Sequence, residues 1–164
     1  MMLVAAHVVI AILGLGLGWA ALRFPNGTPR HRAIGKGYLL AWLGIALSGF
    51  ALGADTPAVS AFEVLTAIGL GCVLLAYAAI RLRHRLGPKA LRWHYVWMTV
   101  SLAALGVTAA NQIVLQAWGP YPRWVFWALV LSPFAFLPPF HRVLDGRYLG
   151  ASTGRRRTSR ASGG

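Results

Sequence analysis

Acidic residues are nearly absent from this chain of 164 residues, which carries three Asp and Glu against sixteen Lys and Arg. Charged residues make up 12% of the chain, whereas soluble globular domains carry about 25%. Hydrophobic residues make up 57%. This composition excludes an ordinary water-solvated surface and indicates a protein whose surface mostly contacts lipid.

Sequence features of soluble enzymes are missing as well. The single cysteine, Cys72, lies in an apolar run, so neither an intramolecular disulfide nor a cysteine metal cluster can form. The three acids are too scattered for paired-carboxylate catalysis. No Gly-rich phosphate loop and no His-Glu-x-x-His sequence occurs. We therefore assign no catalytic residue, leave the presence of a metal site open, and favour a protein that is not an enzyme.

Long apolar runs account for most of the chain. A transmembrane helix needs about twenty mostly apolar residues, and the runs predict an all-α integral membrane protein with five such helices. The first four should form the core of the bundle and the fifth, which holds three prolines, should pack at its periphery. Residues 1–150 then form one transmembrane domain, and the Arg/Ser/Gly-rich residues 151–164 a disordered basic tail. The predicted spans cover residues 3–22, 38–52, 62–82, 93–117 and 124–140.

The basic residues set the predicted orientation. Fifteen of the sixteen fall in the first connection, the third connection and the C-terminal segment, which lie on one side of the predicted membrane. The other side has only Arg123, together with Asp55 and Glu63. Because Lys and Arg are retained on the cytoplasmic side during insertion, the N-terminus should lie outside and the C-terminal tail in the cytoplasm.

This charge distribution also bears on partners. The basic residues form short clusters between apolar runs and do not cover one face of a domain, which excludes a nucleic-acid partner. The bilayer itself is the expected partner. The basic clusters at the cytoplasmic side either only fix the topology or also bind anionic lipid headgroups.

Four of the five histidines fall at the predicted cytoplasmic boundary, and only His7 lies well inside a span. One interpretation makes the four interfacial residues beside basic neighbours. The other brings several of them together in one site at the inner membrane face, because neutral imidazole can ligate haem iron or a metal, or relay protons. The residues proposed for that haem or quinone site are His31, His84, His94 and Trp97.

The fourth predicted span carries a polar stripe. At about 100° per residue, its polar side chains fall within a narrow sector of the helix and should face protein, not lipid. They serve either interhelical hydrogen bonding or the lining of a ligand or proton path. Asn111 lies off the stripe, near the outer end. The stripe consists of His94, Ser101, Thr108, Gln112 and Gln116.

Two short patterns, together with His7 in the first helix, resemble a known family. His31-Arg32-x-x-Gly35-x-x-Tyr38 and His94-x-x-Trp97-Met98 are similar to elements of a bacterial multi-pass membrane family, domain of unknown function 2306, over roughly residues 1–118. The resemblance implies a small helical membrane bundle and no established activity. After Met98 the chain departs from the family, whose members often continue with Arg-rich, aromatic-rich sequence.

A looser similarity links the chain to haem-binding bundles of the cytochrome b561 type. Those proteins hold two haems between histidines of different helices, at the two membrane faces. Here His7 has no second histidine on the outer side, so the similarity implies at most one inner haem b, between His31 and His94 or using His84.

Two functions are therefore expected from the sequence. The first is a multi-pass protein of the bacterial inner (plasma) membrane with a structural, lipid-facing or small-solute role. The alternative is a redox or proton-handling membrane protein with haem or quinone at a histidine site on the cytoplasmic face.

Overall fold

The structure is a computed structural model that describes residues 1–55, 58, 60–122, 124–132 and 135. Every regular element among these residues is a helix, which confirms the predicted all-α fold. The helices are α1 (Met2–Arg23), α2 (Pro29–Gly53), α3 (Ala61–Arg81), α4 (Arg83–Leu86) and α5 (Lys89–Trp118), followed by a helical stretch at 124–132.

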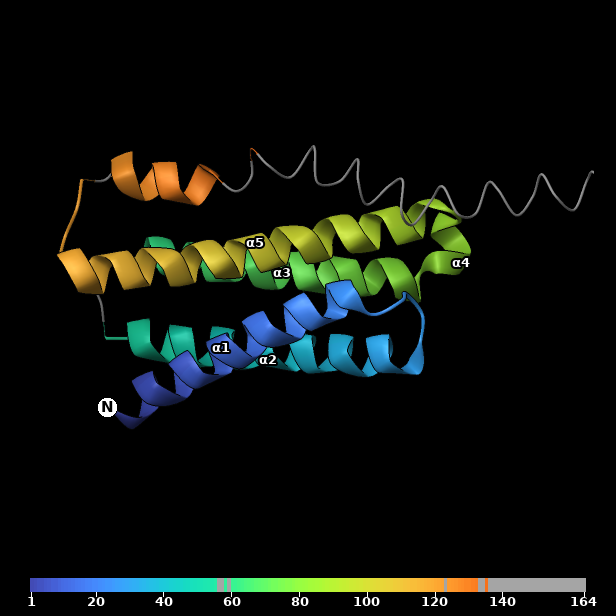
Figure 1. The fold of residues 1–164 in the computed structure, drawn as a ribbon, viewed down its shortest axis with the longest axis horizontal. Coiled ribbons are helices and arrows are strands. Elements are labelled where there is room, and N and C mark those ends of the chain that lie inside the picture. Colours follow the sequence, from blue (N-terminus) through green and yellow to red (C-terminus); the bar gives the residue numbers. More distant parts are fainter. Residues whose placement is uncertain (56–57, 59, 123, 133–134, 136–164) are drawn as a thin grey trace, which may run out of the picture.

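Four of the helices, α1, α2, α3 and α5, are long and apolar enough to cross a membrane. They run alternately up and down in a bundle, with the α1–α2 connection and α4 at one end (Figure 1). The N-terminus, the α2–α3 connection and the last residues of α5 lie at the other end. The remainder of the predicted fifth span, the predicted tail at 151–164 and His141 lie outside the described residues.

Local signals explain where the helices begin. Thr28 caps α2, since its hydroxyl oxygen accepts a hydrogen bond from the His31 amide (3.2 Å) and Pro29 occupies the first turn. The helix therefore begins well before the apolar run at 38–52 and carries basic residues in its first turns. At α3, Ser60 and Glu63 form a reciprocal capping box.

The core joins two helical hairpins. α1 packs mainly on α2, α3 packs mainly on α5, and α2 contacts α3 between them. The ring of Trp42 lies against Gly69, and the ring of Tyr38 lies against Gly18, so small residues allow close approach of the helices. The buried apolar cluster at the centre consists of Tyr38, Trp42, Ile45, Val73, Leu102 and Leu105.

A second, smaller cluster fixes the helical stretch at 124–132. Val130 packs on Leu65 of α3 and Val107 of α5, and Phe126 packs beside them. The ring centres of Phe126 and Phe62 are 5.5 Å apart in an edge-to-face arrangement. The stretch thus covers α3 and α5 at the end where α5 finishes (Figure 1).

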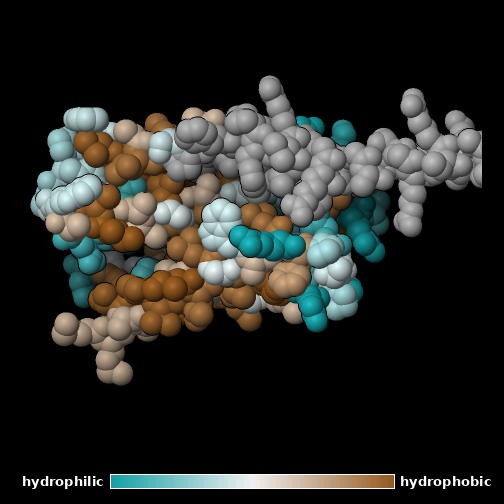
Figure 2. All heavy atoms as spheres, in the orientation of Figure 1, coloured by the Kyte–Doolittle hydropathy of each residue, from teal (hydrophilic) through white to brown (hydrophobic). Residues whose placement is uncertain are grey.

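The outer surface is apolar around the middle of the bundle. Large aliphatic side chains are exposed on the long helices, including Val9, Ile12, Leu40, Leu47 and Leu75. Figure 2 shows apolar atoms covering the middle of one face, with hydrophilic atoms gathered toward both ends. A helix that is apolar all round is typical of a membrane span, and this surface is the one expected of a membrane protein.

Candidate functional site

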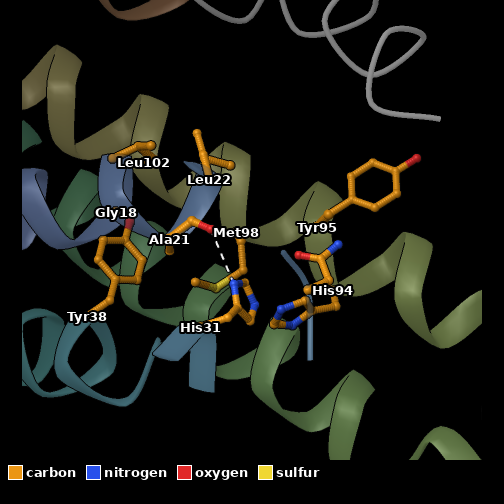
Figure 3. Close-up of a pocket in the computed structure, with 10 residues that line it drawn as sticks. Gly18, Ala21, Leu22, His31, Tyr38, His94, Tyr95, Met98 and Leu102 are labelled. Carbon is orange, nitrogen blue, oxygen red and sulfur yellow. Dashed lines mark hydrogen bonds between the residues drawn. The ribbon is translucent and has the colours of Figure 1, made fainter. Parts of the chain in front are cut away.

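A small cavity lies at the end of the bundle that carries α4 and the α1–α2 connection. Its volume is about 40 Å³, which is room for about three water molecules. Its wall combines apolar residues of α1 and α5 with a few polar or sulfur-bearing side chains (Figure 3). The latter are Asn26, His31, Tyr38, His94, Tyr95 and Met98.

The first turn of α2 places His31 in the cavity wall. The ring Nδ1 of His31 lies 3.2 Å from the carbonyl oxygen of Ala21, on α1. Because a carbonyl oxygen only accepts hydrogen bonds, Nδ1 must be the protonated nitrogen in this contact. The Nε2 of neutral His31 therefore carries a lone pair that can accept a hydrogen bond or bind a metal ion.

His94 is held in the same way from the other side. Its Nδ1 lies 2.9 Å from the carbonyl oxygen of Ala76, on α3, so it donates and leaves Nε2 with a lone pair. The ring centres of His31 and His94 are 6.4 Å apart, with their planes at 71°. The backbones of two different helices thus hold two neighbouring imidazoles in one tautomer, and both rings are half-buried.

The other residues predicted for this site lie elsewhere. Trp97 is not in the cavity wall; its ring lies 6.1 Å from that of Trp93. Its buried indole Nε1 has no hydrogen-bond partner in the part of the chain that the structure describes. His84 is exposed on α4 and is also absent from the wall. The structure therefore brings together two of the four predicted residues, His31 and His94.

The residues of the polar stripe on α5 differ in burial and in hydrogen-bond partners along the helix. Ser101 is fully buried and bonds the Tyr38 hydroxyl (3.0 Å), while the Thr108 hydroxyl donates to a carbonyl oxygen of its own helix. Gln112 is half-buried and Gln116 is exposed. A hydrogen bond across the bundle is therefore seen for Ser101, whereas the Thr108 hydroxyl bonds within α5.

Sequence reasoning missed three polar contacts. Asn111, placed off the stripe, is fully buried, and its side-chain oxygen accepts a hydrogen bond from the Tyr121 hydroxyl (2.6 Å). His7 is paired with Ser48 of α2 (2.8 Å) at the opposite end from the cavity. Tyr38 lines the cavity and bonds Ser101. Ser48 lies on the side of α2 that faces α1. The sequence alone does not show this, because the pairing of α1 with α2 must be known first.

No known protein family, curated protein or solved structure matches the chain. What the cavity can bind must follow from its own donors. No group of three or more His, Cys, Asp and Glu side chains gathers within the described ranges. The Tyr38 hydroxyl bonds Ser101, and the Tyr95 ring points away from the histidines (Figure 3). The remaining donors are two imidazole nitrogens, a thioether and an amide.

The size of the cavity limits its ligand. Sites for drug-sized molecules and cofactors occupy about 300–1,000 Å³, many times the 40 Å³ available here. A haem or a quinone ring does not fit between His31 and His94 as they are placed, and the helices would have to separate to admit one. The cavity suits a few waters, a small polar solute or a single ion.

Proposed function

We propose that the protein is a multi-pass protein of the bacterial cell membrane whose role centres on a small-solute or ion site at its cytoplasmic end. The observation that carries this proposal is the pair His31 and His94. Each ring is fixed through Nδ1 to a backbone carbonyl, which leaves a lone pair on Nε2, and both residues line a cavity of about 40 Å³. A purely structural role does not require two such neighbouring, half-buried imidazoles held in the same tautomer.

The proposed topology has five crossings, with the N-terminus outside and the C-terminal tail in the cytoplasm. Its support is that the basic residues that flank the α1–α2 connection, at the end of α1 and in the first turns of α2, and those of α4 are exposed at the same end of the bundle. Retention of Lys and Arg inside would make this end, with its cavity, cytoplasmic. The helical stretch at 124–132 supports a fifth crossing, because it begins at the bundle end away from α4 and packs on α3 and α5.

We also propose membership of the family catalogued as domain of unknown function 2306. The two motifs of that resemblance are far apart in sequence, yet His31 and Tyr38 of the first and His94 and Met98 of the second line one cavity. Motif residues that meet in space support a shared site rather than chance similarity of apolar segments.

Reporter fusions test the topology. Fusions after Gly27 and Gly87 should give the cytoplasmic signal, and fusions after Ala54 and Gly119 the outside signal. A cytoplasmic signal after Ala54, or an outside signal after Gly87, would refute the orientation and with it the placement of the site.

A redox role with haem is the second candidate, and the two neighbouring imidazoles, each with a lone pair on Nε2, are the observation in its favour. Haem binding would require the helices at this end of the bundle to separate, because the cavity is smaller than a haem. The test is an optical spectrum of protein purified in mild detergent from cells supplied with haem precursor, oxidised and then dithionite-reduced. A Soret band that shifts on reduction and disappears in His31→Ala or His94→Ala would establish haem ligation. A spectrum without visible bands from folded protein would exclude it.

A further inference from the structure

Three donor side chains with affinity for soft metals line the same cavity. His94 and Met98 are one helical turn apart on α5 and therefore share a face. His31 approaches from α2. Figure 3 shows the three side chains in the wall of one small space, and the same three belong to the cavity lining.

The two imidazoles are prepared as ligands. Metal-binding histidines commonly donate their other ring N–H to a backbone carbonyl or carboxylate, which fixes the tautomer and the ring orientation. His31 and His94 both make this contact, to Ala21 and Ala76. Two imidazoles on opposite sides of one metal ion have ring centres about 6 Å apart, given metal–nitrogen bonds of about 2 Å. The observed separation is 6.4 Å.

The donor set selects the metal. Structural zinc sites take four ligands, mostly thiolates, imidazoles and carboxylates, and the described residues gather no three of His, Cys, Asp and Glu. A thioether beside imidazoles favours Cu(I), a soft ion that accepts two or three ligands. The uncharged donors and the exposed Arg30, Arg32 and Arg92 at this end also make a monovalent ion less costly to bury than a divalent one.

We propose that the cavity binds one Cu(I) ion through the Nε2 atoms of His31 and His94 and the sulfur of Met98. This assignment rests on the proposed small-ion site and names its ligand. The ion would enter at the bundle end where Asn26 is exposed in the cavity wall. A cavity of about 40 Å³ suits an ion without its hydration shell, and the protein supplies the ligands that replace the shell.

The test uses the full chain, purified in detergent and titrated anaerobically with Cu(I) against a chromophoric Cu(I) chelator. One ion per chain should bind, and X-ray absorption should show nitrogen and sulfur neighbours. Hydrogen-bond partners of metal ligands alone are worth about 10–100-fold in affinity. His31→Ala and His94→Ala should therefore each weaken Cu(I) binding by at least that factor.

Met98→Leu is the sharpest variant, because it keeps the side-chain volume and should fold. It should weaken Cu(I) binding and remove the sulfur signal, while any weak Zn(II) binding to the two histidines stays unchanged. His84→Ala is the matched control, since it removes an exposed histidine of the same bundle end and should leave Cu(I) binding intact.

Three results would overturn the assignment: no Cu(I) uptake by the wild type, unchanged uptake by the folded Met98→Leu variant, or Zn(II) bound more tightly than Cu(I). If one of these occurs while the fusions place Gly27 and Gly87 inside, the copper assignment fails and the proposed site stands. Fusions that place Gly27 and Gly87 outside refute the proposed function, whichever metal binds.

Discussion

The hydroxyl groups of Tyr38 and Ser101 lie 3.0 Å apart at the centre of the bundle, and both residues are fully buried. The Ser101 hydroxyl also lies 2.8 Å from the carbonyl oxygen of Met98, to which it donates. The Tyr38 hydroxyl therefore donates to Ser101. This contact joins α2 to α5 beside the cavity, because Tyr38 and Met98 both line the cavity.

Tyr38→Phe tests the contribution of this contact. The substitution removes one buried hydrogen bond, and interhelical bonds in membranes average about 0.6 kcal/mol with a maximum of about 1.7. We expect a loss of unfolding free energy in that range, measured by denaturant titration in detergent. In a double-mutant cycle, Tyr38→Phe and Ser101→Ala together should cost less than the sum of the single changes. Strict additivity would show that the two hydroxyls do not interact.

Gly69 provides a test of the packing between α2 and α3. A Cβ at this position would overlap the Trp42 ring, which is 2% exposed. Gly69→Ala should therefore destabilise the protein by about 1–3 kcal/mol, as overpacking of a filled core does. Thermal unfolding in detergent, followed by helical circular dichroism, measures the loss.

Gly71→Ala is the matched control on the same helix, because a Cβ there meets no atom within 4 Å. Alanine is favoured over glycine in a helix by about 1 kcal/mol, so this variant should be neutral or more stable. Equal destabilisation by both substitutions would contradict the packing described for Trp42 and point to a general intolerance of substitution in α3.

The sequence predicted the all-α fold because apolar runs of the length of a bilayer are strong signals. It placed the start of the second span at residue 38, whereas the helix begins at Pro29. Hydropathy marks where a helix enters lipid, and a helix can continue beyond that point into water. The cap formed by Thr28 and Pro29 was legible in the sequence and marks the true start.

The candidate site was harder to predict. His31 and His94 were chosen for their shared depth in the membrane, and they meet. Trp97 was named with His94 because both belong to one short motif, but it lies about 60° around the helix from His94, and its ring packs beside that of Trp93 instead of in the cavity wall. Asn111 was missed because a helical wheel assumes one buried direction. α5 changes partners along its length, from α1 near Leu102 to the stretch at 124–132 near Val107, and its buried face rotates accordingly.

Two helix caps of the same kind allow a test of how His31 is held. Thr28 caps α2 and accepts from the His31 amide, while Ser60 caps α3 and accepts from the Glu63 amide. Thr28→Ala and Ser60→Ala should each cost about 1 kcal/mol. Hydrogen exchange should quicken in the first turn of the affected helix only. Faster exchange of the His31 amide in Ser60→Ala would contradict the independence of the two caps.

The connection from α5 to the stretch at 124–132 contains a polar contact between Tyr121 and Asn111 that can be removed in two ways. Tyr121→Phe leaves the fully buried oxygen of Asn111 without its partner, and an unsatisfied buried acceptor costs about 1–3 kcal/mol. Asn111→Leu combined with Tyr121→Phe replaces both groups by apolar ones, so the double variant should be more stable than Tyr121→Phe alone. Hydrogen exchange of residues 124–132 should increase in the single variant and recover in the double variant.

The exposed Gln116 serves as the control, since Gln116→Leu should change neither the stability nor the hydrogen exchange. Exchange that rises further in the double variant would contradict this account and would show that the Asn111 side chain stabilises the stretch without its Tyr121 partner.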